Sequence, residues 1–222
     1  MFNGKLKSTG GILVKICGIT NEPDAVAAIE AGADALGFNV VSRSKRCIDL
    51  DAAAGWIRKL PKTVWKVAVT ADPNWEDACR IGQLPFVDAL QLHGNESAEF
   101  CRRLRDAGIA FAKALPVSHS QSLVPIPDFF TDTIILDSAC SAGFGGSGKT
   151  FPWKFAWQFT QKHRKLNLIL AGGLNPDNVA EAVTIVHPRG IDVTTGVEEK
   201  PGRKDPQLVK AFIDAARQAA RS

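Results

Sequence analysis

Short apolar runs alternate with amphipathic segments along most of the chain. A short apolar run bounded by turn residues is typical of a strand buried on both faces, as in a parallel sheet. The pattern therefore predicts eight strands. They are expected at Ile12–Cys17, Ala35–Val40, Val64–Val69, Ala89–His93, Ala110–Ala114, Thr133–Asp137, Leu168–Ala171 and Ile191–Thr194.

Most of the intervening segments have the spacing of amphipathic helices. Two of them start with a capping side chain before proline, at Asn175-Pro176 and Asp205-Pro206. The proline-containing stretch Val117–Asp128 is expected to be a loop or a poor helix. Helices are predicted at Glu22–Ala31, Asp51–Lys59, Trp75–Ile81, Ser97–Ala107, Pro152–Lys162, Pro176–Val186 and Pro206–Arg221.

Strands separated mostly by helices favour parallel pairing with crossover helices. The pattern alone fits either a closed barrel or an open doubly wound sheet. Eight strands within 222 residues favour the α/β class and a single (β/α)8 TIM barrel, whose active site lies at the carboxyl ends of the strands. We expect residues 1–10 to be a loose N-terminal extension and residues 11–222 to form one catalytic domain.

Composition and charge limit the kinds of binding partner and the cellular location that we expect for the protein. Hydrophobic residues make up 45% of the chain, and we find neither a secretory signal nor an apolar run of the roughly 18 residues that span a bilayer. The net charge of +4 is mild and spread out, so we expect no nucleic-acid or membrane partner. Five cysteines without CxxC spacing argue against a disulfide framework or a metal site and favour the cytoplasm.

Two side chains at predicted strand ends are candidates for chemistry. Cys17 closes the first strand just before Gly18, where a thiol can face a ligand. The alternative is that Cys17 is a buried small hydrophobe. Asp137 closes the sixth strand, at the end where barrel enzymes place functional groups, although it would also suit a cap or a loop hydrogen bond.

Other polar residues share strand faces with these candidates. Gln91 and His93 alternate along the fourth strand and so share a face. If that face is the barrel interior, His93 lies near the mouth; the alternative is a structural histidine. Lys15 shares the face of Cys17. Asp192, inside the eighth strand, is expected either to bond a sugar hydroxyl or to pair with Lys15.

A basic loop and several glycine turns suggest an anionic ligand. The loop 42–46 follows the second strand and either holds a substrate carboxylate or forms a solvated charge cluster. The turns at 172–173 and 195–196 follow the last two strands, where barrels commonly bind phosphate. Residues 143–150 match a nucleotide-binding pattern, but Pro152 implies that the helix begins later, so a loop that closes over a ligand fits better.

Together these residues resemble the phosphoribosylanthranilate isomerase family. Each motif is weak alone, but their common order is specific, and the resemblance runs from Val14 to Phe212. The motifs are Lys15-Ile16-Cys17-Gly18-Ile19-Thr20, Ala33-Asp34-Ala35-Leu36-Gly37-Phe38, Ser44-Lys45-Arg46, Ala89-Leu90-Gln91-Leu92-His93-Gly94, Ile135-Leu136-Asp137, Gly145-Gly146-Ser147-Gly148, Ala171-Gly172-Gly173-Leu174-Asn175-Pro176 and Ile191-Asp192-Val193-Thr194-Thr195-Gly196-Val197-Glu198.

The resemblance implies a cofactor-free Amadori rearrangement of N-(5-phosphoribosyl)anthranilate to 1-(2-carboxyphenylamino)-1-deoxyribulose 5-phosphate, in tryptophan biosynthesis. It implies that Cys17 is the general base, that Asp137 is the general acid and that Arg46 contacts the anthranilate carboxylate. The partner is then a small phosphorylated substrate, and the protein is a monomer or homodimer. Further substrate contacts are expected at Gln91, His93 and Asp192, and phosphate contacts at Gly146, Gly172, Gly173, Thr195 and Gly196.

The chemistry of this reaction sets requirements for the two catalytic groups. A buried carboxylic acid can protonate the ring oxygen of ribose. Cys17 needs nearby positive charge to act as a base at neutral pH, which Lys15 or Arg46 could supply. One alternative is another phosphate-binding barrel enzyme such as indole-glycerol-phosphate synthase, whose catalytic Lys and Glu have no match here. The other is a sugar-phosphate-binding barrel that has lost catalysis, against which the presence of Cys17 and Asp137 counts.

Overall fold

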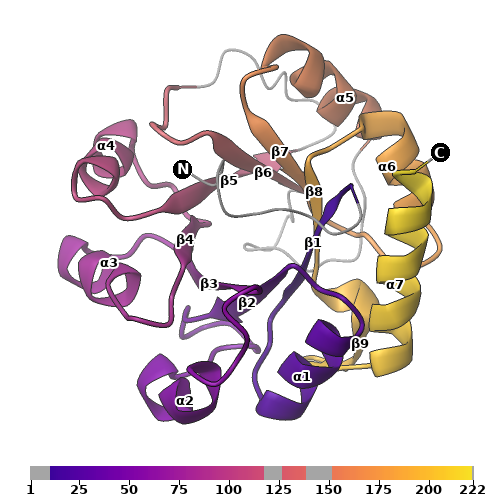
Figure 1. Ribbon diagram of the computed structural model, residues 1–222. Helices are drawn as coiled ribbons and strands as arrows, with labels where there is room; N and C mark the ends of the chain where they lie inside the picture. The colour runs from indigo at the N-terminus through magenta and orange to yellow at the C-terminus, as the bar shows by residue number, and fades with distance from the viewer. Residues whose placement is uncertain (1–10, 118–126, 139–151, 222) are drawn as a thin grey trace.

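The computed structural model describes residues 11–117, 127–138 and 152–221. Eight parallel strands form a closed barrel in which each strand pairs with the next and β8 pairs with β1, which confirms the predicted (β/α)8 fold (Figure 1). The expected N-terminal extension, residues 1–10, lies outside the described residues. The barrel strands are β1 (Leu13–Cys17), β2 (Ala35–Asn39), β3 (Trp65–Thr70), β4 (Ala89–Leu92), β5 (Phe111–Val117), β6 (Thr133–Ser138), β7 (Asn167–Leu170) and β8 (Gly190–Val193).

Helices surround the barrel, and α7 lies between α6 and α1 (Figure 1). Side-chain caps fix where several of them begin: the Asn21 side chain accepts a hydrogen bond from the Asp24 amide, and Asp205 caps the last helix in the same way. The helices are α1 (Glu22–Glu30), α2 (Leu50–Ile57), α3 (Trp75–Gly82), α4 (Ala98–Asp106), α5 (Trp153–Lys162), α6 (Val179–Val186) and α7 (Pro206–Ala219).

The structure corrects the expected limits of two elements. Strand β5 continues through Pro116, which lies opposite Asp137 of β6, and ends at Val117. Val117 is therefore not part of the predicted loop, and residues 118–126 of that loop lie outside the described residues. A proline is tolerated in a strand where the ladder does not need its missing N–H. Helix α6 begins at Val179 rather than Pro176, because the Asn175 side chain accepts from the amides of Asp177 and Asn178 and holds a turn there.

A short polar hairpin after β8 was not predicted. It consists of β9 (Glu198–Lys200) and the two-residue β10 (Arg203–Lys204), and it follows a single 3-10 turn at Thr195–Val197. Its residues lack an alternating apolar face, which is the signal that a strand prediction needs. The hairpin is important for the site because Lys204 is almost completely buried.

The hydrophobic core consists of one main cluster and two small ones. Large side chains such as Phe38, Phe159 and Phe212 are fully buried in the main cluster, which packs the strands against the helices. Two small clusters, rich in alanine, are separate from the main core. Their members are Ala35, Trp65, Val67 and Ala89 in one cluster and Ala112, Ala114, Ile135 and Ala171 in the other.

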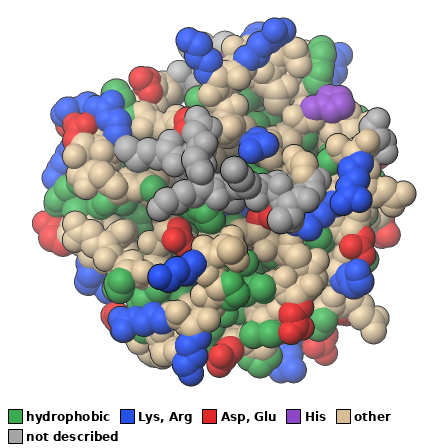
Figure 2. All heavy atoms as spheres, viewed as in Figure 1, with side chains coloured by type: hydrophobic (Ala, Val, Ile, Leu, Met, Phe, Trp, Pro, Cys, Tyr) green, Lys and Arg blue, Asp and Glu red, His purple; other side chains and the backbone are tan. Residues whose placement is uncertain are grey.

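The surface carries charges of both signs. Figure 2 shows Lys and Arg side chains interspersed with Asp and Glu on the face in view, in keeping with the mild net charge. In the part of the chain that the structure describes, no helix is both long and apolar enough to cross a membrane.

Candidate active site

A cavity of about 590 Å³ opens at the carboxyl ends of the strands. Every predicted site residue in the described part of the chain lines it, although these residues come from six different strands or the loops that follow them. Gly146 and the expected closing loop 143–150 lie outside the described residues. The predicted residues in the cavity wall are Cys17, Arg46, Gln91, His93, Asp137, Gly172, Gly173, Asp192, Thr195 and Gly196.

Cys17 ends β1, is nearly buried and faces Gly37 of β2. A Cβ atom at Gly37 would lie 2.7 Å from the Cys17 sulfur and 2.9 Å from the Lys15 nitrogen. Glycine therefore leaves the space in which the thiol and the ammonium group sit side by side. The expected cation next to Cys17 is present.

Lys15 also pairs with Asp192, as one of the two sequence alternatives predicted. The Lys15 Nζ atom donates to Asp192 Oδ2 over 2.8 Å, and both residues are buried. Burial by itself would lower the pKa of Lys15, but the nearby Asp192 and Cys17 more than offset it and raise that pKa. Burial raises the pKa of Asp192, in spite of the opposing charge of Lys15.

His93 and Asp137 meet across the cavity wall. The Nε2 atom of His93 lies 3.3 Å from Asp137 Oδ2, and the Gln91 side-chain nitrogen lies 3.3 Å from His93 Nδ1. With the amide donating to Nδ1, the ring carries its hydrogen on Nε2, toward the carboxylate. Gln91 and Asp137, both predicted from the sequence, thus orient the ring of His93.

Arg46 is already engaged by a carboxylate that the sequence did not assign to the site. Its Nε and Nη2 atoms donate to Glu198 over 2.8 and 2.6 Å, in the bidentate geometry that suits guanidinium and carboxylate. The hydrogen bond that Arg46 donates to Glu198 raises the pKa of Arg46, against the effect of burial. Among the described residues no hydrogen bond from Arg46 Nη1 is found, and Arg46 also lines the cavity.

The two glycine turns of the predicted phosphate site require glycine. Gly172 and Gly173 have φ angles of +86° and +67°, which disfavour residues with a side chain. A Cβ atom at Gly172 would come within 2.7 Å of Asp137 Oδ1, and one at Gly196 would overlap the Leu174 carbonyl. The turns after β7 and β8 therefore pack against each other, and the first lies close to Asp137.

Comparison with known proteins agrees with this geometry. A family model described as N-(5'phosphoribosyl)anthranilate (PRA) isomerase matches residues 14–215. The isomerase of Thermotoga neapolitana is 41% identical over 206 residues, covering 93% of this chain and 98% of the relative. That of Geobacter sp. strain M21 is 42% identical and covers 92% of this chain and 97% of its own.

The chain belongs to the phosphoribosylanthranilate isomerase family. Its activity is therefore this isomerisation in tryptophan biosynthesis, as the sequence motifs predicted. The crystal structure of the Thermotoga maritima family member has a TM-score of 0.85 at 37% identity, covering 93% of this chain and 99% of that one. A second family structure, in complex with reduced 1-(o-carboxyphenylamino)-1-deoxyribulose 5-phosphate, has a TM-score of 0.81 at 34% identity and the same coverage.

Sequence reasoning missed two residues next to the phosphoribosylanthranilate isomerase cavity. Glu198 bonds Arg46, and Lys204 donates to both Glu198 Oε1 and the Thr194 carbonyl, each over 3.0 Å. For Glu198 the only available sequence signal was its place at the end of the motif that begins with Ile191. For Lys204, which lies in the unpredicted hairpin, the sequence offered no signal of a role in the site.

Proposed function

We propose that Cys17 and Asp137 are the general base and the general acid of the isomerisation. The observation that carries this proposal is that both groups line one cavity while each touches its own supporting group, Lys15 for Cys17 and His93 for Asp137. An acid and a base with separate environments can be held in opposite protonation states at one pH.

In the first step the carboxylic acid of Asp137 delivers its proton to the ring oxygen of the ribose. The bond from that oxygen to C1 breaks, and the lone pair of the anthranilate nitrogen forms the C1–N double bond of an iminium ion. The ring N–H of His93, 3.3 Å from Asp137 Oδ2, stabilises the carboxylate that remains.

In the second step the Cys17 thiolate removes the proton from C2 of the open-chain iminium ion. The C2–H electrons form a C1–C2 double bond, and the iminium nitrogen becomes neutral. The resulting enolamine then takes a proton at C1 and loses one from its C2 hydroxyl to give the ketone. Lys15, Arg46 and Lys204 all interact electrostatically with Cys17, and positive charge favours the thiolate.

We assign the two ends of the cavity to the two charged groups of the substrate. The proposed role of Arg46 is to hold the anthranilate carboxylate through its remaining donors, while the turns at 172–173 and 195–196 hold the phosphate. Between them, Gln91 Oε1 and Asp192 Oδ1 are buried acceptors without a hydrogen-bond partner in the described ranges. Unpaired buried acceptors are costly, so they suit the hydroxyl groups of the sugar.

The direct test is an assay of the purified protein with freshly prepared phosphoribosylanthranilate. Loss of the anthranilate-type fluorescence reports turnover. Wild-type protein should be active, whereas Cys17→Ser and Asp137→Asn should bind the reduced product analogue yet turn over far more slowly. Binding without turnover by the wild type would instead support the alternative of an inactive sugar-phosphate-binding barrel.

The proposal also covers the domain organisation, the cellular location and the oligomeric state of the protein. We propose that residues 11–222 form one catalytic domain in the cytoplasm that takes a small phosphorylated substrate. One solved relative is described as mutually generated monomers of a dimeric isomerase from Thermotoga maritima. Whether this chain is a monomer or homodimer is measured by light scattering of the full chain in solution.

A further inference from the structure

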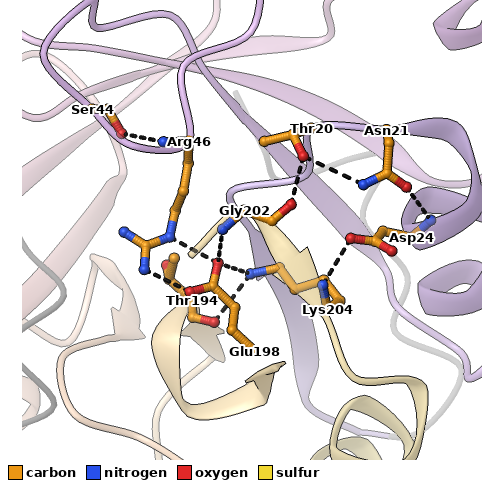
Figure 3. A network of polar contacts seen from close by, with 9 residues as sticks. All are labelled: Thr20, Asn21, Asp24, Ser44, Arg46, Thr194, Glu198, Gly202 and Lys204. Carbon is orange, nitrogen blue, oxygen red and sulfur yellow. Dashed lines mark hydrogen bonds and ion pairs between the residues drawn. The ribbon is translucent and has the colours of Figure 1, made fainter. Parts of the chain in front are cut away.

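The Glu198 side chain is buried behind the wall of the cavity. Only 2% of it is exposed, and it is not among the residues that line the cavity, whereas its partner Arg46 is. Figure 3 shows its carboxylate between the tips of Arg46 and Lys204. A carboxylate in this place acts on a ligand only through its neighbours.

Both carboxylate oxygens of Glu198 accept hydrogen bonds. Oε2 accepts from Arg46 Nη2, while Oε1 accepts from Arg46 Nε, from Lys204 Nζ and from the Gly202 amide over 2.8, 3.0 and 3.2 Å. Opposite charges and several donors favour the ionised form of a buried carboxyl. Burial raises the pKa of Glu198, but Arg46 and Lys204 outweigh it, so the net pKa is lowered.

The contacts of Glu198 reach three loops of the barrel mouth (Figure 3). Arg46 belongs to the loop after β2, where Ser44 accepts from its amide over 3.1 Å. Lys204 Nζ donates to the carbonyl of Thr194, the residue before the phosphate turn, over 3.0 Å. Thr20, after β1, donates to the Gly202 carbonyl over 2.6 Å. One carboxylate therefore connects the anthranilate end of the cavity with the phosphate end.

Two cations, Arg46 and Lys204, pair with the single carboxylate of Glu198. A second carboxylate, Asp24, accepts from the Lys204 backbone amide over 2.8 Å. Burial lowers the pKa of Lys204, and Glu198 is the main group that opposes this effect. Loss of the carboxylate would leave a buried lysine without its partner and a guanidinium without its bidentate acceptor.

We propose that Glu198 is a positioning residue of the isomerase. It fixes the direction in which Arg46 presents its free donors to the substrate carboxylate. Through Lys204 it also holds the Thr194 carbonyl, and with it the backbone that begins the phosphate turn. The proposal rests on the proposed role of Arg46.

The test measures binding of two ligands by calorimetry. The reduced product analogue carries both the aromatic carboxylate and the phosphate, whereas ribose 5-phosphate carries only the phosphate. We expect Glu198→Gln to weaken the analogue by about 10- to 100-fold, the size of a charged hydrogen bond, and ribose 5-phosphate by less. In steady-state kinetics KM should rise while kcat stays near the wild-type value, because Glu198 touches no reacting atom.

The matched control is Asp34→Asn. Asp34 is also a largely buried carboxylate paired with an arginine, Arg217, but it precedes β2 at the opposite end of the barrel. This variant should lose thermal stability and keep both affinities. A Glu198→Gln variant that loses stability and keeps both affinities, like the control, overturns the proposal.

A double-mutant cycle separates positioning from a general structural effect. On an Arg46→Ala background, Glu198→Gln should weaken the analogue little further, because the group that it positions is gone. Equal weakening on both backgrounds contradicts the proposal. If Arg46→Ala weakens both ligands alike, the assigned role of Arg46 fails and the anthranilate arm of the proposal fails with it.

A second variant keeps the proposal testable if Glu198→Gln does not fold. Lys204→Met leaves the pair between Arg46 and Glu198 intact but removes the bond to the Thr194 carbonyl. We expect it to weaken ribose 5-phosphate and the analogue by the same factor. Unchanged binding of ribose 5-phosphate overturns the link to the phosphate turn.

Discussion

The Nε2 atom of His93 lies 3.3 Å from the Oδ2 atom of Asp137, inside the cavity wall of the barrel. Gln91 reaches the other ring nitrogen of His93, so the imidazole is held between an amide and a carboxylate. In this arrangement the ring N–H of His93 faces the Asp137 carboxyl group. The group that we propose as the acid is therefore held in place by His93, which Gln91 orients in turn.

Asp137→Asn should greatly reduce kcat and change KM only modestly. The amide has the shape of the acid but cannot deliver a proton, and this interaction matters mainly in the transition state. Loss of a general acid typically costs about 10²- to 10⁴-fold in rate. Steady-state kinetics measures both parameters. A variant that changes only KM would show that Asp137 binds substrate and that the acid lies elsewhere.

His93→Asn tests whether the imidazole shares in acid catalysis. An amide in this place can still donate one hydrogen bond to Asp137 but cannot exchange a proton with it. We expect kcat to fall by at least about tenfold, less than for loss of the acid itself, which typically costs about 10²- to 10⁴-fold, and affinity for the reduced product analogue to change little. Weaker affinity with an unchanged kcat would assign His93 to substrate binding alone.

Gly37→Ala should impair catalysis without unfolding the protein. The added Cβ would lie 2.7 Å from the Cys17 sulfur and 2.9 Å from Lys15 Nζ, so one of these groups must move. We expect a marked fall in kcat. The control is Gly55→Ala in α2, where a Cβ meets nothing within 4 Å, and it should raise stability by about 0.5–1 kcal/mol with normal activity. Normal activity of Gly37→Ala would show that catalysis does not need the space that Gly37 leaves beside Cys17 and Lys15.

The cysteines should differ in their reactivity. Burial raises the pKa of the Cys101 thiol to about 11, so this group stays neutral at ordinary pH. Cys47 is exposed. Alkylation at about pH 8, near the reference value for a free thiol, followed by mass spectrometry should modify Cys47 and leave Cys101 unmodified in the folded protein. The raised pKa of Cys101 also affects stability: the free energy of unfolding should fall as pH rises from the pKa of this thiol in the unfolded chain toward about 11. Rapid modification of Cys101 in native protein would contradict its burial.

Hydrophobic patterning was sufficient to predict eight strands, because each buried strand leaves an apolar run in the sequence, and that number within 222 residues favoured the barrel over an open doubly wound sheet. It failed where structure depends on polar backbone contacts: the turn held by Asn175 delays α6, and the hairpin that carries Lys204 has no apolar face. The contact of Lys15 with Asp192 was one of two alternatives that the sequence offered for Asp192. The bond between Arg46 and Glu198 was not predicted, since it joins the loop after β2 to β9, and the two residues are 152 positions apart in the sequence.

The central claim is that the Cys17 thiolate removes the proton from C2 of the substrate. It is tested most directly by the turnover of Cys17→Ser with substrate that carries either hydrogen or deuterium at C2. A hydroxyl is a far weaker base, so kcat should fall by about 10²- to 10⁴-fold while binding of the product analogue persists. Proton removal then limits the rate, and the deuterated substrate should react several times more slowly. Turnover near the wild-type rate, or a slow variant without an isotope effect, would contradict the assignment of Cys17 as the base.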